Sequence, residues 1–90
     1  MATKTTKKQV LTVEQRYELA DWLANSYKSF SKDYVSANRR TVFGVIINTP
    51  NKDGETMVSK LGEEVATHVT NLTINRLLGS NNHKVVCTLF

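Results

Sequence analysis

The residues with the clearest chemical potential are basic, and they lie in two blocks. Residues 1–9 carry three lysines and no acid, and residues 28–40 carry two lysines and two arginines against one acid. Basic blocks that share one side of a fold can lie along phosphates and release condensed counterions. The candidate nucleic-acid-binding residues are Lys4, Lys7, Lys8, Lys28, Lys32, Asn38, Arg39 and Arg40. The alternative is a solubilising tail followed by a solvated loop.

Residues 31–46 have some features of a helix-turn-helix DNA reader. The polar and basic residues 38–40 precede an apolar stretch, as at the entry to a recognition helix, where they would contact bases or phosphates. Two features depart from the motif: Ser31 and Lys32 stand where small or apolar residues are expected, and the following run is rich in β-branched residues. A second stretch, 64–78, has a turn about two residues too short for this motif.

No enzymatic site is indicated. His68 and His83 are the only histidines, and neither has a serine or cysteine beside it in a nucleophile turn. His83 and Cys87 would converge on a metal from a helix, but a strand would separate them by about 13 Å. Glu63 and Glu64 would project about 100° apart from a helix, as solvated acids do. We expect no catalytic residue, no metal and no cofactor, and His68 as a hydrogen-bonded residue at the core edge.

Two helices are predicted in the first half of the chain. Thr12 and Gln15 match a capping box and start an amphipathic helix over 13–28, whose polar face includes Arg16 and Asp21. Trp22 lies at the edge of its apolar stripe and is expected to form part of the core wall. Ser31 can cap a short helix over 31–38, with Asp33 in the favourable first turn.

Residues 41–48 are predicted as a strand. The run from Thr41 to Ile47 is almost wholly β-branched or aromatic, and Pro50 to Gly54 closes it with turn residues. The spacing of Val42, Val45 and Ile46 also suits the buried side of a short helix, so periodicity leaves both structures open.

A central helix follows, from residue 55 or 56 to about 78. Val58, Leu61, Val65 and Val69 follow helical spacing, although residues 56–61 could instead return as the second strand of a hairpin. Gly62 should weaken this helix by about 1 kcal/mol relative to alanine, and residues 67–71 are a predicted end or bend. Gly79 is a natural stop. Residues 84–90 are predicted as a last strand.

These elements predict a small α+β domain over 11–90, preceded by a mobile basic tail over 1–10. The length of 90 residues suits one domain. Two strands are too few for a stable sheet, so open strand edges favour a homodimer or an added partner strand. A second class of function follows: an adaptor or inhibitor that binds an acidic host protein through a strand edge or the Trp22 face.

Composition sets the remaining expectations. The net charge of +4 is compatible with polyanion binding. No apolar run approaches the roughly 20 residues that cross a bilayer. A single cysteine and a start without the apolar core of a secretion signal favour the cytoplasm, or the host cytoplasm for a viral protein. The many threonines and asparagines in a short chain suit a phage or mobile-element accessory protein. The favoured function is therefore a small, basic, non-enzymatic regulator that binds nucleic acid, with DNA preferred as its ligand.

Overall fold

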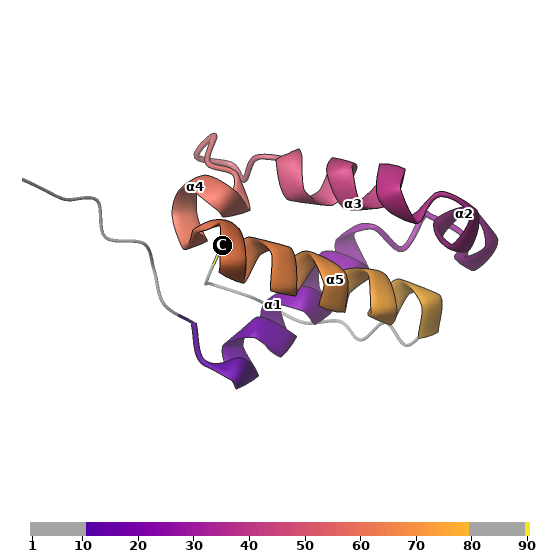
Figure 1. Cartoon of the computed structure of the whole chain (residues 1–90), viewed down its shortest axis with the longest axis horizontal. Coiled ribbons are helices and arrows are strands. Elements are labelled where there is room, and N and C mark those ends of the chain that lie inside the picture. The colour runs from indigo at the N-terminus through magenta and orange to yellow at the C-terminus, as the bar shows by residue number, and fades with distance from the viewer. Residues whose placement is uncertain (1–10, 80–89) are drawn as a thin grey trace, which may run out of the picture.

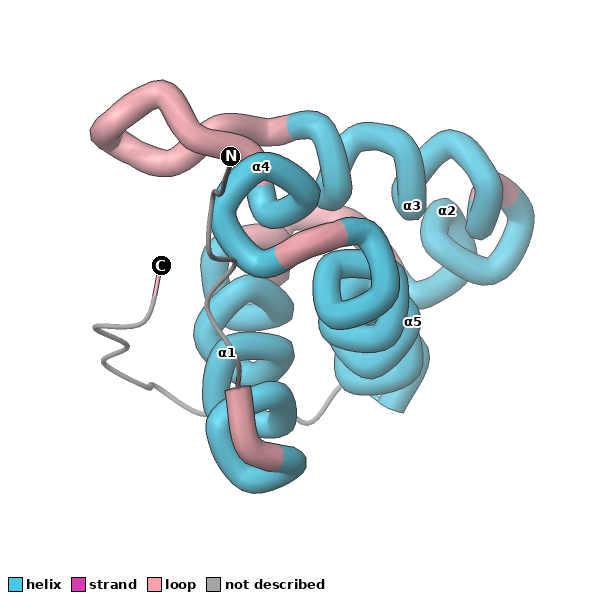
Figure 2. Tube along the Cα trace, turned by 60° about the vertical axis from the view of Figure 1, so that its left-hand side comes forward, coloured by secondary structure: helices cyan, strands magenta, loops and turns pink. Residues whose placement is uncertain are grey.

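All regular structure in the described part of the chain is helical. The computed structural model describes residues 11–79 and residue 90. The helices are α1 (Val13–Ser26), α2 (Lys32–Ala37), α3 (Arg39–Asn48), α4 (Met57–Leu61) and α5 (Glu63–Gly79). α5 contacts each of the other four helices, and α3 runs antiparallel to it (Figures 1 and 2). The predicted α+β class is therefore wrong, and the fold is all-α over these residues.

The first helix confirms the predicted capping box. The Thr12 hydroxyl accepts a hydrogen bond from the Gln15 amide at 3.1 Å, and the Gln15 side chain accepts one from the Thr12 amide at 2.8 Å. These two bonds satisfy amides that a helix start leaves without partners. The buried stripe of α1 consists of Leu19, Ala20, Leu23 and Ala24. The helix ends at Ser26, two residues before the predicted boundary.

The second helix is also confirmed, within one residue at each end of the predicted 31–38. The Ser31 hydroxyl accepts a hydrogen bond from the Tyr34 amide at 3.0 Å, and Asp33 lies in the first turn. Val35 is the one residue of this short helix that is buried. A single buried anchor and a good cap therefore hold α2 in place.

The predicted strand over 41–48 is wrong, because these residues belong to α3. Val42 and Ile46, four residues apart, are 0% and 1% exposed, so they lie on one buried helix face. β-Branched residues cost a helix only a few tenths of a kcal/mol each. Burying the two side chains contributes about 1.5 to 3 kcal/mol apiece. Val45, which shared the proposed helical spacing, remains 40% exposed.

The central helix is interrupted at Gly62 and not at 67–71. Gly62 closes α4 with φ 91° and ψ 156°, a conformation that is essentially restricted to glycine. α5 then continues through the predicted bend. The buried hydroxyls of Thr70, inside that stretch, and of Thr73, just after it, donate to the carbonyls four residues back, at 2.7 and 2.8 Å. The stretch 64–78 therefore has no turn, and its resemblance to a helix-turn-helix is wrong. The alternative hairpin at 56–61 is replaced by α4.

One hydrophobic core joins the helices. Its members are Leu11, Leu19, Ala20, Leu23, Ala24, Val35, Val42, Ile46, Met57, Leu61, Val65, Ala66, Val69, Ile74 and Leu77. The strand edge that residues 41–48 were expected to offer a second copy does not exist, so this reason for expecting a homodimer is removed. The predicted tail over 1–10 and the predicted strand over 84–90, except Phe90, lie outside the described residues.

Two glycine substitutions should have opposite effects on stability. Gly62→Ala should lower the free energy of unfolding by about 1 to 3 kcal/mol, because alanine tolerates its positive φ poorly. Gly44→Ala should raise it by about 0.5 to 1 kcal/mol, because Gly44 lies inside α3 and an added Cβ meets no atom within 4 Å. Urea denaturation followed by circular dichroism measures both. A neutral or stabilising Gly62→Ala would contradict the break between α4 and α5.

Candidate nucleic-acid interface

The second basic block lies at one end of the molecule. It spans the loop after α1, the whole of α2 and the first turn of α3, close to the C-terminal half of α5 (Figure 1). Lys28, Lys32, Arg39 and Arg40 are all exposed. The helical arrangement therefore gathers these four cations into neighbouring segments at one end. The lysines of the first block, Lys4, Lys7 and Lys8, lie outside the described residues.

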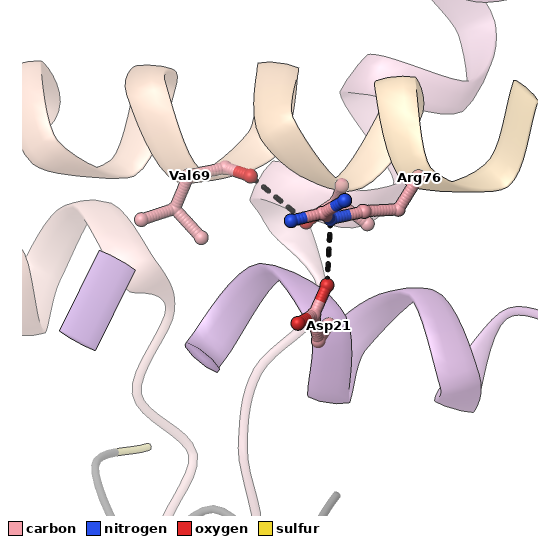
Figure 3. A network of polar contacts seen from close by, with 4 residues as sticks. Asp21, Val69 and Arg76 are labelled. Carbon is pink, nitrogen blue, oxygen red and sulfur yellow. Dashed lines mark hydrogen bonds and ion pairs between the residues drawn. The ribbon is translucent and has the colours of Figure 1, made fainter. Parts of the chain in front are cut away.

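None of these four cations forms an ion pair with a described residue. The salt bridge that the structure contains within 11–79 joins Arg76 Nε to Asp21 Oδ1 at 2.7 Å (Figure 3). All 8 acidic residues of the sequence lie in this range. Every Asp and Glu side chain of the protein is therefore described, and none of them pairs with Arg39 or Arg40. Arg39 and Arg40 thus keep their hydrogen-bond donors available to an external anion.

The start of α3 adds a local electrostatic imbalance. Asn38 precedes the helix, but its side chain forms no cap and donates instead to the Tyr34 carbonyl at 3.0 Å. The first turn contains Arg39 and Arg40 and no acid. A helix N-terminus already carries partial positive charge, so two guanidinium groups there are unfavourable until an anion approaches. The Asn38 side-chain amide bonds to the last turn of α2, and its contact with a ligand stays a prediction.

An open hollow lies between α3 and α5 beside these arginines. Its lining residues are Arg39, Arg40, Phe43, Asn71 and Ile74. Phe43 is half-buried and Ile74 is buried, so they form the apolar part, while Asn71 and the two arginines are exposed. Sequence reasoning missed Phe43, because a strand over 41–48 would not group it with Arg39 as a helical spacing of four does. It also missed Asn71, which no local signal connects to α3.

The α2 and α3 pair differs from a helix-turn-helix in its connection. Only Asn38 separates the two helices, and α2 has 6 residues. The standard motif uses a turn of about three or four residues. The similarity is therefore limited to basic residues at the start of the second helix.

Two polar side chains of α1 that were expected to face water instead bind α5. Asp21 is paired with Arg76, whose guanidinium also lies over the Tyr17 ring at 5.8 Å. Arg16 donates through Nη1 to His68 Nδ1 at 3.1 Å, so that nitrogen acts as an acceptor. His68 is half-buried. These contacts fasten α1 to α5 and keep both arginines out of the candidate interface.

The remaining described candidates for chemistry are two acids of α5. Glu63 and Glu64 are exposed in the first turn of α5, where negative charge is favourable. No cluster of three or more metal-type ligands occurs among the described residues. His83 and Cys87 lie outside them.

Trp22 packs against the core at its edge, as expected from its place on α1. It is half-buried and lines a small hollow of about 130 Å³. The other lining residues are Leu23, Ser26, Tyr27, Thr49, Pro50, Asn51 and Phe90. This hollow is mostly apolar and carries no charged side chain.

Comparison of the chain with protein-family models, with curated proteins and with solved structures finds no significant match. Among the helices of the described residues, none has the length and apolar character that a membrane span requires.

The Asp21 and Arg76 pair should contribute little to stability despite its short distance. Both side chains remain partly exposed, at 23% and 38%, and partly exposed pairs typically couple by about 0.2 to 1 kcal/mol. A double-mutant cycle with Asp21→Asn and Arg76→Gln, measured by urea denaturation, should give a coupling energy in that range. A value well above it would show that this pair, and not apolar packing, dominates the contact between α1 and α5.

Proposed function

We propose that the protein is a small, non-enzymatic, regulatory nucleic-acid-binding protein that contacts phosphates with the end formed by α2 and the start of α3. The observation that carries this proposal is the exposure of Arg39 and Arg40 without an ion pair to any described residue. Guanidinium groups bind phosphate oxygens through paired hydrogen bonds. Two such groups that line the same hollow suit a repeating phosphate backbone.

The charge distribution supports a local site and not a general attraction. Residues 11–79 contain 8 of the 12 basic residues and all 8 acids, so their formal charge is zero. The net charge of +4 comes from Lys4, Lys7, Lys8 and Lys84. Binding by the described fold must therefore depend on where its cations lie, with Lys28 and Lys32 close in sequence to the arginines. The N-terminal lysines would add contacts that are independent of sequence.

Protein binding through the Trp22 face is the second candidate. The apolar hollow beside Trp22 and Pro50 favours it, since interface cores are rich in tryptophan and poor in charge. A partner of this class could be an acidic protein drawn in by the basic end, or a second copy of the chain. The strand-edge route over 41–48 is no longer available. Salt-dependent oligonucleotide binding is expected only for the first function.

Removal of the two arginines should separate a local site from a general charge effect. Arg39→Ala with Arg40→Ala should weaken binding to labelled oligonucleotides about tenfold at low salt and reduce the salt slope by about two. Fluorescence anisotropy over a salt series measures both, with single-stranded and duplex probes.

The matched control is Lys52→Ala with Lys60→Ala, which removes the same charge near α4, at the other end of α5 from α2 (Figure 1). The control should retain nearly all binding of the unaltered protein. The proposal is wrong if the unaltered protein shows no salt-dependent binding to either probe, or if the arginine variant binds as tightly as the control.

A further inference from the structure

The hollow between α3 and α5 combines an apolar floor with polar and cationic edges. Arg39 and Arg40 each neighbour Phe43 on the surface of α3, because residues four and three apart lie close together on a helix. Asn71 and Ile74, three residues apart on α5, complete the lining from the opposite side. The half-buried Phe43 and the buried Ile74 supply the apolar surface, and three exposed polar side chains line the same hollow.

This set of side chains matches the parts of one nucleotide. An aromatic ring offers a stacking surface to any base. Each stacked base raises the affinity about fivefold or more, as judged by substitution of the ring with alanine. An asparagine amide can donate to and accept from a base edge. Arginines beside the ring can bind the phosphates on either side of that base. No acid lines the hollow, so nothing in the lining repels a phosphate.

The shape of the surface favours an unpaired base over a duplex. Helical motifs that recognise duplex DNA insert a protruding helix into a groove. In this protein Arg39 and Arg40 line a hollow, and α3 is flanked by α5 and α2. The bases of a duplex are stacked on one another, so a duplex offers no free base face to Phe43. An unstacked base of a single strand can enter it.

We infer that the hollow lined by Arg39, Arg40, Phe43, Asn71 and Ile74 accepts an unpaired nucleobase, and that the protein therefore prefers single-stranded nucleic acid to a duplex. This inference rests on the proposed function and specifies its ligand. DNA and RNA single strands both fit this site, because the stacking surface, the amide and the arginines contact the base and the phosphates, which both strands carry.

The test compares a labelled 12-nucleotide single strand with the same strand in a duplex, as DNA and as RNA, by fluorescence anisotropy with the full chain. The single strand should bind about tenfold more tightly than the duplex at the same salt concentration. Phe43→Leu, which removes the ring and keeps apolar volume, should weaken single-strand binding about fivefold and duplex binding much less. Phe43→Tyr, which keeps the ring, should bind like the unaltered protein.

A second measurement locates the contact without a substitution. In a ¹H–¹⁵N NMR titration, the side-chain amide of Asn71 and the backbone amide of Phe43 should shift with the single strand and much less with the duplex. Comparison of the DNA and RNA probes then shows which strand is the better ligand.

The possible results separate this inference from the proposed function. Duplex binding that equals or exceeds single-strand binding overturns the nucleobase site and leaves the nucleic-acid-binding function standing. The same conclusion follows if Phe43→Leu has no effect while Arg39→Ala with Arg40→Ala weakens the binding of both probes. A folded protein that binds neither probe overturns both. An unshifted Asn71 amide at saturating single strand also overturns the nucleobase site.

Discussion

Packing against α5 is the constraint on which the rest of this fold depends. α2 has 6 residues and α4 has 5, and isolated helices shorter than about 12 to 15 residues are marginal in water. Each of them, like α1 and α3, contacts α5. α5 can serve several neighbours because its buried residues cover a broad surface. Thr70 and Thr73 lie in that buried surface, and the hydroxyl of each donates a hydrogen bond to a backbone carbonyl of α5. Their buried polar groups are therefore satisfied.

This arrangement divides the four arginines into two groups. Arg16 and Arg76 are engaged at the contact between α1 and α5, with His68 and Asp21. Arg39 and Arg40 lie where α3 begins, beside the C-terminal half of α5, and no described carboxylate pairs with them. The antiparallel course of α3 along α5 brings them close to Asn71 (Figure 1). The division follows from helix packing, because residue type alone does not distinguish an engaged arginine from a free one.

The same packing explains why net charge is a poor guide to this protein. The described helices are formally neutral, so a binding surface can arise only from separation of charge within them. Acids in the first turn of α5 and cations at the start of α3 lie near opposite ends of α5, because the two helices run in opposite directions (Figure 1). The like charges at the start of α3 are held together by backbone geometry, and an anionic ligand would relieve their repulsion.

The sequence by itself determined the features whose causes lie within a few consecutive residues. The caps at Thr12 and Ser31 and the two helices that they start could be predicted, because a cap bonds to amides only three residues away. Only tertiary structure decided that 41–48 is helical, since β-branched residues suit either structure and burial of Val42 and Ile46 against the core selects one. Tertiary structure also decided that Asn71 and Arg39 line the same hollow. Such a grouping depends on the packing of residues far apart in the chain, and no local sequence pattern predicts it.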